Sequence, residues 1–168
     1  APAYLNNELY FTSSRGNGRI YEATGTPFTN LFKVTSRGAN VDMATLEQLP
    51  PTINTENVNN GCVAFSPDGK MMVFAKGNTG KRKGGDDVDL YFARFRNGVW
   101  SEPLIITGSV NTPKSWDSAP AFSQDGRTLY FASNRPVSGT LSKDFDIWVV
   151  ERLGNTKWGE PKNLGEPI

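Results

Sequence analysis

The sequence predicts an all-β chain, a β-propeller segment of three four-stranded blades within a larger ring of about six to eight blades. Three observations lead to this prediction. They are a sequence repeat of 57 residues, an Asp-Gly turn at the same place in two copies, and short apolar strands without helical periodicity. We expect the blades over residues 1–57, 58–115 and 116–168.

The repeat is clearest between the second and third copies of the unit. Short motifs recur at a spacing of 57 residues, and the spacing becomes 58 near the end of each copy. A spacing held over so long a stretch is typical of tandem structural units. The motifs are residues 64–70 with 121–127 and 89–91 with 146–148 at spacing 57, and 100–103 with 158–161 at spacing 58.

A more divergent copy opens the chain. Residues 9–15 (LYFTSSR) match residues 129–135 (LYFASNR). The joins between copies repeat as well, because residues 53–55 (INT) and 110–112 (VNT) are again 57 residues apart. The first copy departs from the pattern in that Asn30 stands where the second copy has Asp89, and the tryptophan of the fourth strand is missing.

Each copy reads as four short strands. The first strand ends in a turn at Asp68-Gly69 or Asp125-Gly126, where glycine accepts a positive φ, and Asn6-Asn7 takes this place in the first copy. The second strand (9–12, 71–75 or 129–133) is apolar on both faces, which predicts burial between neighbouring sheets. The four predicted strands are 63–66 or 119–123, 70–75 or 128–133, 90–95 or 147–150, and 104–106 or 163–164.

The composition excludes several functions. With 18 Lys and Arg against 17 Asp and Glu, the chain has no electrostatic footprint for nucleic acid, and it has no apolar run long enough for a membrane span. Without histidine, Ser-His-Asp and Cys-His catalysis and a histidine-ligated zinc are impossible within the chain. The single cysteine, Cys62, lies in an apolar run and is expected to be a buried small hydrophobe.

These motifs resemble the WD-like, TolB-type β-propeller repeat, through its turn (122–126), the strand that follows (129–135) and the Asp-Ile-Trp strand (146–148). The resemblance extends to repeats of bacterial cell-envelope proteins, often from Bacteroidota, in which such propellers often precede an OmpA-like domain. It covers the whole chain, strongly over 61–168, and implies a propeller fold and protein partners in an envelope complex. No OmpA-like domain lies within these residues, so peptidoglycan binding is not carried over.

Two arginines are candidate partner-binding residues. Arg135 and Asp146 flank the loop between the second and third strands, where antiparallel pairing predicts an ion pair that fixes the loop. The alternative is that Arg135 faces the propeller pore and binds an anionic group. Arg15 repeats this arginine in the first copy.

Further candidates lie in loops. Lys81 and Arg82 follow a glycine-containing stretch that lacks the pattern of a phosphate-binding loop, and they read as a solvated loop or as a contact for an acidic polymer. Trp116 precedes the first strand of the third copy and either seals the joint between blades or serves as a stacking platform.

The carboxylates have structural explanations. Asp68 and Asp125 occupy turns, and Asp146 begins a strand, so we expect no catalytic residues and no enzymatic activity from this chain. The acidic clusters at 86–89 and 144–146 supply only part of the six to eight oxygens that calcium needs. We therefore expect no bound metal and no cofactor.

The most consistent function is a non-catalytic protein-interaction or scaffold module of a bacterial cell-envelope assembly, periplasmic or associated with the outer membrane. The alternative is an accessory propeller of a larger hydrolase. Three blades cannot close a ring. We expect further blades from the same polypeptide, a second copy or another subunit, packed on apolar outer faces. The residues expected on those faces are Leu9, Phe11, Leu31, Phe32, Leu129, Phe131, Ile147 and Trp148.

Overall fold

The computed structural model describes residues 2–16, 19–22, 24–77, 88–113, 115–137 and 144–165. These residues form strands and turns, and the all-β prediction is confirmed. Across the described ranges, no helix is present that could cross a membrane.

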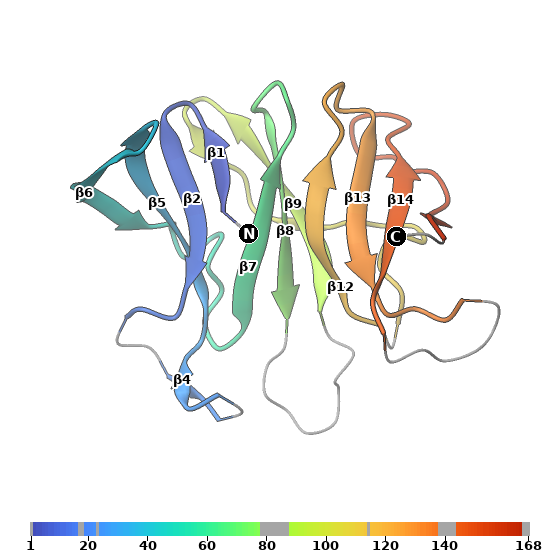
Figure 1. The fold of residues 1–168 in the computed structure, drawn as a ribbon, viewed down its shortest axis with the longest axis horizontal. Coiled ribbons are helices and arrows are strands. Elements are labelled where there is room, and N and C mark those ends of the chain that lie inside the picture. The colour runs from blue at the N-terminus through green and yellow to red at the C-terminus, as the bar shows by residue number, and fades with distance from the viewer. Residues whose placement is uncertain are drawn as a thin grey trace.

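Three antiparallel sheets stand side by side in chain order, as Figure 1 shows. Each is one blade, and each lies within one of the three expected segments. Blade 1 is β1 (Ala3–Leu5), β2 (Glu8–Ser13), β5 (Asn30–Arg37) and β6 (Asn40–Gln48), with the small hairpin of β3 (Ile20–Tyr21) and β4 (Thr26–Pro27) beside it. Blade 2 is β7 (Asn59–Phe65), β8 (Met71–Gly77), β9 (Asp89–Arg96), β10 (Val99–Trp100) and β11 (Leu104–Ile105). Blade 3 is β12 (Asp117–Phe122), β13 (Thr128–Ser133), β14 (Asp146–Glu151) and β15 (Lys162–Asn163).

The fourth strand of blade 2 is broken into two pieces. Both β10 and β11 pair with the same strand, β9. Pro103 stands between the two pieces, and a proline has no N–H to donate to the ladder. The fourth strand of blade 3 is broken in the same way. Arg152 and Trp158 form an isolated bridge, and β15 pairs separately with β14.

The predicted turns are confirmed at all three places. In blade 1, Asn6 and Asn7 have φ values of 49° and 62°, as a two-residue hairpin turn with two left-handed residues requires. In blade 2, the Ser66 hydroxyl donates to Asp68 Oδ1 (2.6 Å), and the same oxygen accepts from the Lys70 N–H (3.0 Å). Ser123 and Asp125 repeat these contacts in blade 3 (2.6 and 3.0 Å).

The hydrophobic core lies in the two spaces between blades. One cluster joins blades 1 and 2 and the other joins blades 2 and 3, so blade 2 is packed on both sides. Burial of the second strand on both faces is therefore confirmed only for β8, in which residues 71–75 are all buried. The prediction is wrong for residues 9–12 and 129–133, which are buried only in part, because an outer blade has a neighbour on one side only.

The prediction of which residues lie on the uncovered outer faces is also wrong in part. Leu129 and Phe131 are buried against blade 2, and Leu31 and Phe32 are also buried. The face of blade 3 that points away from blade 2 instead carries Tyr130, with Ile147 as expected (36% and 41% exposed). Tyr130 faces away from blade 2 because successive residues of a strand point to opposite faces of the sheet, and its neighbours Leu129 and Phe131 face blade 2.

A bulge interrupts the inner strand of blades 2 and 3. Pairing shifts between Gly61 and Ala64 in one and between Ser118 and Ala121 in the other. The bulged residues Cys62 and Ala119 have positive φ values of 52° and 48°. Cys62 is half-buried, so it is only partly the buried hydrophobe that was expected.

Candidate functional site

The joins between blades are held by two equivalent asparagines. Asn111 Oδ1 accepts from the Leu90 N–H (2.7 Å), and its amide donates to the carbonyls of Leu90 and Ile106 (both 2.9 Å). Asn54 makes the same three contacts one blade earlier, to Leu31 and Leu49. Each side chain satisfies the backbone groups of a third strand and ties it to the following join.

Arg135 pairs with Asp117 rather than with Asp146. Its Nη2 lies 2.7 Å from Asp117 Oδ1, and its guanidinium also donates to the carbonyls of Ser109 and Val110. Asp117 is fully buried, and its second oxygen accepts from the Thr112 N–H (2.8 Å). The guanidinium is enclosed, so this group is a structural tie between the join and blade 3.

Asp146 does not pair with Arg135, and the positions of the strands explain why. Asp117, Ser133 and Asp146 lie directly opposite one another across three strands. Arg135 lies two residues after Ser133, and its guanidinium reaches the inner strand, which carries Asp117. Asp146 instead accepts from the Asn163 side-chain amide (3.2 Å) on the outer strand.

Arg15 has the same local setting but remains exposed. Its Nε donates to the Ser13 hydroxyl (3.0 Å), and its guanidinium lies over the rings of Phe11 and Phe32. Among the described residues, no carboxylate forms an ion pair with it.

Trp116 lies in a joint between blades. It packs against the core between blades 2 and 3 and meets the Phe145 ring edge-on at 6.5 Å. It also lines a small apolar cavity of about 250 Å³ with Thr12, Cys62 and Val88.

Two of the predicted candidate sites lie in a loop that the structure does not describe. Lys81 and Arg82, like Asp86 and Asp87, lie outside the described residues. Within the ranges that the structure describes, no three acidic or cysteine side chains gather as a metal site would require.

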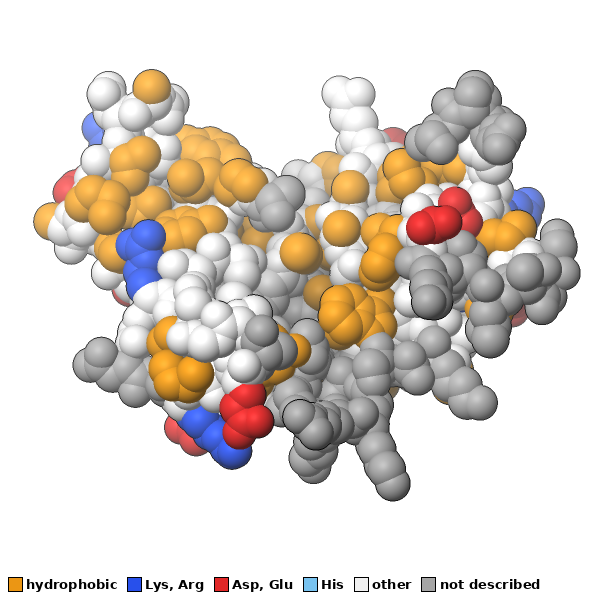
Figure 2. Space-filling view, turned by 60° about the horizontal axis from the view of Figure 1, so that its bottom comes forward, with side chains coloured by type: hydrophobic (Ala, Val, Ile, Leu, Met, Phe, Trp, Pro, Cys, Tyr) orange, Lys and Arg blue, Asp and Glu red, His pale blue; other side chains and the backbone are white. Residues whose placement is uncertain are grey.

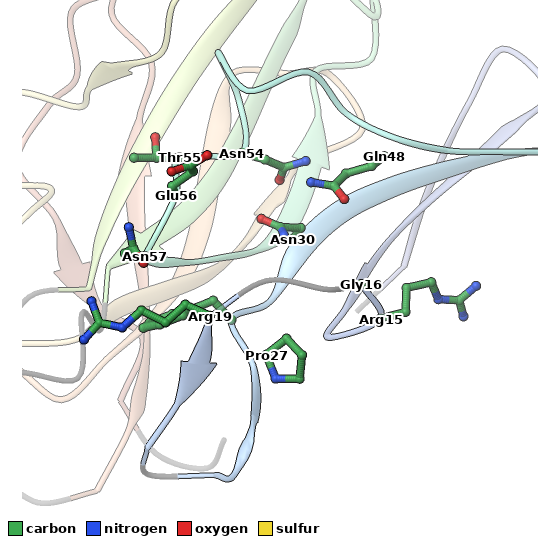
Figure 3. Close-up of a pocket in the computed structure, with 11 residues that line it drawn as sticks. Arg15, Gly16, Arg19, Pro27, Asn30, Gln48, Asn54, Thr55, Glu56 and Asn57 are labelled. Carbon is green, nitrogen blue, oxygen red and sulfur yellow. The ribbon is translucent and has the colours of Figure 1, made fainter.

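A polar pocket of about 310 Å³ lies at the loop end of blade 1 (Figure 3). Asn30, Gln48 and Asn54 lie together in its middle, while the side chains of Arg15 and Arg19 point away in opposite directions. The amide of Asn54 is already bonded to backbone. Among the described lining residues, the two arginines therefore do not converge on a common point.

A larger groove opens at the opposite end of blades 1 and 2, next to the tight turns. We call it the turn-end groove; its volume is about 480 Å³. Trp100 forms its wall, with Phe95 at 5.1 Å and Phe65 at 5.8 Å between ring centroids. Phe95 and Val99 are exposed (43% and 65%). Its lining comprises Leu5, Asn6, Glu8, Tyr10, Lys33, Glu47, Leu49, Pro50, Thr52, Gly69, Phe95, Gly98, Val99 and Trp100.

One charged cluster borders the turn-end groove. Lys33 Nζ lies between Glu8 (2.8 Å) and Glu47 (3.1 Å). Burial alone would lower the pKa of Lys33, but its hydrogen bonds to Glu8 and Glu47 outweigh this and raise the pKa. Burial, followed by the hydrogen bond to Glu8, raises the pKa of Tyr10 well above its usual value. The rim carries two acids and one base, so it is acidic.

The loop end of the molecule has a different character. Figure 2 turns this end forward and shows hydrophobic side chains over much of the described surface, with the charged ones few and scattered. No broad charged patch that could attract an acidic polymer gathers on the described surface of this face.

Three features of the structure were not predicted from the sequence. The first is the set of backbone contacts made by Asn54 and Asn111. The recurrence of asparagine at these positions, within a repeated join, was the sequence signal for them. The second is the partner of Arg135. An ion pair with a carboxylate was predicted, but with Asp146 rather than with Asp117. The turn-end groove combines residues of blade 1, of the join that follows it and of blade 2, and sequence spacing gives no signal for it.

The fold is similar to solved propeller structures. TolB from Acinetobacter baumannii aligns over 90% of this chain with 15% identity and a TM-score of 0.55. A putative TolB from Agrobacterium tumefaciens aligns over 86% with 19% identity and a TM-score of 0.51. A puromycin-hydrolyzing peptidase from Mycobacterium tuberculosis aligns over 95% with 18% identity and a TM-score of 0.57.

The chain spans less than half of each of these structures, namely 29%, 39% and 22% of their lengths. No family model and no curated protein matches the chain. At these identities the likeness concerns the fold, which agrees with the three sheets and their order. The chain therefore has a TolB-type β-propeller fold, of which it provides three blades.

Proposed function

We propose that this chain is a non-catalytic protein-interaction module of a bacterial cell-envelope assembly, periplasmic or associated with the outer membrane. The observation that carries the proposal is the turn-end groove. Aromatic residues are enriched at the centres of protein interfaces, and here Trp100 and Phe95 line a groove that Val99 borders. The resemblance of the repeats to those of envelope proteins supports the location.

The occupant is an extended protein segment with an apolar anchor and a basic side chain. The anchor fits beside Trp100, and the basic group fits the acidic rim of Glu8 and Glu47. Carboxylates in the described residues serve turns and strand contacts, as at Asp68 and Asp146. With no histidine in the sequence, an interaction role is more consistent than catalysis.

Site-specific photo-crosslinking in the producing bacterium tests this proposal. A photoreactive residue at position 99, in the turn-end groove, is expected to give a discrete product in the envelope fraction, and Trp100→Ser is expected to weaken it. Position 41 is the matched control, because Val41 is also an exposed strand valine (43%) but lies on β6. Equal products from both positions, or none from position 99, would contradict the proposal.

A second candidate is an accessory propeller of a larger hydrolase. The likeness to the mycobacterial peptidase supports it, since this chain matches 22% of that structure. On either proposal the chain alone has no hydrolase activity. Assays with glycoside, ester and peptide substrates decide this, and turnover that disappears on replacing Asp125 or Asp146 in a folded variant would overturn it. A catalytic domain in the same polypeptide would favour the second candidate.

A further inference from the structure

Four arginines of blades 2 and 3 gather beside the tight turn of blade 3. Arg127 and Arg152 line an open depression of about 520 Å³ there. Arg94 reaches this depression from blade 2, because its Nη2 donates to the carbonyl of Asn155, which also lines it. Arg96 is the next residue of β9 on the same face of the sheet, since alternate residues of a strand point the same way. We call Arg94, Arg96, Arg127 and Arg152 the arginine cluster.

Two members of the arginine cluster are held by neighbouring carbonyls of one loop. Arg152 Nε donates to the carbonyl of Gly154 (3.2 Å), and Arg94 donates to that of Asn155. These contacts keep both guanidinium groups at the same place, while some N–H donors of each have no partner among the described residues. Arginines that are already oriented lose less conformational freedom when they bind a ligand. The loop contacts therefore leave a prepared set of donors at the depression.

The arginine cluster creates a positive potential. Burial, followed by the positive charges of Arg96 and Arg152, lowers the pKa of Arg94, and the charge of Asp68 opposes this shift. Asp68, and Asp125 in the depression, each accept from a serine hydroxyl and a backbone N–H of their own turns. In the part of the chain that the structure describes, no carboxylate forms an ion pair with any of the four arginines. An anion bound here relieves their mutual repulsion.

The preceding pair of blades is built without such a cluster. The backbone N–H groups of Ser36, Phe95 and Arg152 make the same hydrogen bond in the three blades, to the carbonyls of residues 7, 70 and 127, and these bonds align the third strands. The positions of Arg94, Arg96 and Arg152 then correspond to Thr35, Arg37 and Phe95. Because blades 1 and 2 pack together with one arginine at these three positions, blade packing does not explain why blades 2 and 3 have three.

We propose that the arginine cluster binds neighbouring carboxylates on an acidic segment of a partner protein. A guanidinium group offers two parallel N–H donors that match one carboxylate, and several such groups around an open depression fit several carboxylates in a row. The choice of a protein ligand rests on the proposed function, because Phe95 of the turn-end groove lies between Arg94 and Arg96 in β9. A segment that crosses the turn end of blade 2 contacts the groove with its apolar anchor and the arginine cluster with acidic residues beyond that anchor.

A fluorescein-labelled hexaglutamate peptide, measured by fluorescence anisotropy at low ionic strength, tests the site with a probe that has no apolar anchor. We expect saturable binding to the unmodified protein and much weaker binding of a labelled hexaglutamine peptide. Arg96→Gln and Arg152→Gln are each expected to weaken hexaglutamate binding by about fivefold or more, because each removes a pair of donors. Arg96 is exposed, so Arg96→Gln remains decisive if Arg152→Gln disturbs the loop at Gly154.

Arg37→Gln is the matched control, because Arg37 is an exposed arginine at the position of blade 1 that corresponds to Arg96. Equal binding by this control and by Arg96→Gln would overturn the proposal, and so would equal binding of the two peptides or no binding of hexaglutamate. Displacement of the labelled peptide by inorganic triphosphate at lower concentrations than by unlabelled hexaglutamate would also overturn it, in favour of a phosphate-bearing ligand. The probe does not need the turn-end groove, so loss of the crosslink at position 99 with retained hexaglutamate binding would contradict the proposed function and leave the arginine site standing.

Discussion

Arg135 and Asp117 form a buried ion pair, with 2.7 Å between Nη2 and Oδ1 and side-chain exposures of 8% and 0%. The pair connects the end of β13 to the first residue of β12. Through the Val110 carbonyl it also connects both strands to the join that follows blade 2. A charge enclosed in this way is stabilised only while its partner is present.

Asp117→Ala is expected to lower the free energy of unfolding by about 3 to 5 kcal/mol, because it leaves the Arg135 charge buried and unpaired. Urea denaturation measures the loss, with Glu160→Ala as the control for removal of an exposed carboxylate. The double variant Asp117→Ala, Arg135→Met is expected to lose less than the two single variants together. A single-variant loss as small as that of the control would contradict the role of the pair.

Asn111→Ala is expected to cost about 2 to 3 kcal/mol of stability, because the backbone N–H and carbonyl of Leu90 lose their side-chain partner in a buried place. Asn54→Ala is expected to cost a similar amount at the earlier join. Denaturation of both variants is compared with that of Asn40→Ala, which removes an exposed asparagine. The interpretation is wrong if all three variants unfold at the same denaturant concentration.

The local structure of this protein was predictable from its sequence. Asp125 and Gly126 could be assigned to a turn because a short side-chain acceptor and a positive φ leave few alternatives. The aromatic and β-branched residues of β9 and β14 likewise predicted strands where strands occur. The sequence repeat then allowed these strands to be grouped into blades.

Contacts between blades were less predictable, because they depend on which side of a strand a residue faces. Arg135 was assigned to Asp146, which is near along the hairpin, whereas the inner strand brings Asp117 to it. The same limit applies to the turn-end groove, whose wall at Trp100 depends on the break in the fourth strand. Sequence spacing fixes neither the bulges nor the break.

The turn carboxylate Asp68 provides a test by pH. The Ser66 hydroxyl, followed by the Lys70 N–H, holds the pKa of Asp68 below its ordinary value of 3.8. The ionised group therefore stabilises the fold above about pH 4, and this contribution is lost as the pH falls through the lower pKa of the folded state. Asp68→Asn is expected to be less stable by about 0.5 to 1 kcal/mol at pH 7, because an exposed group is screened by solvent.

Thermal unfolding of both proteins between pH 7 and pH 2 measures this difference. The stability gap between unmodified protein and Asp68→Asn should narrow as the pH falls from about 4 through the lower pKa of the folded state, where the native carboxylate also becomes protonated. A gap that stays constant across this range would show that the charge of Asp68 does not contribute.

The outer face of blade 3 has a buried counterpart in blade 2. Register places Ala121, Tyr130 and Val149 side by side across three strands. The residue of blade 2 that corresponds to Tyr130 is Val73, which is completely buried against blade 3. The same surface of the propeller repeat is therefore covered in one blade and open in the next.

We expect this open face to make the isolated chain self-associate, because apolar surface of a kind that packs against a blade elsewhere is exposed to water. Ile147→Glu should reduce the association, since it places a charge on the face at a residue that is 41% exposed. Val41→Glu is the control, because Val41 is exposed to a similar degree (43%) on β6 of blade 1. Light scattering over a concentration series measures the mass of all three proteins. If the unmodified chain is a stable monomer that unfolds cooperatively at every concentration, then three blades suffice and the face needs no neighbour.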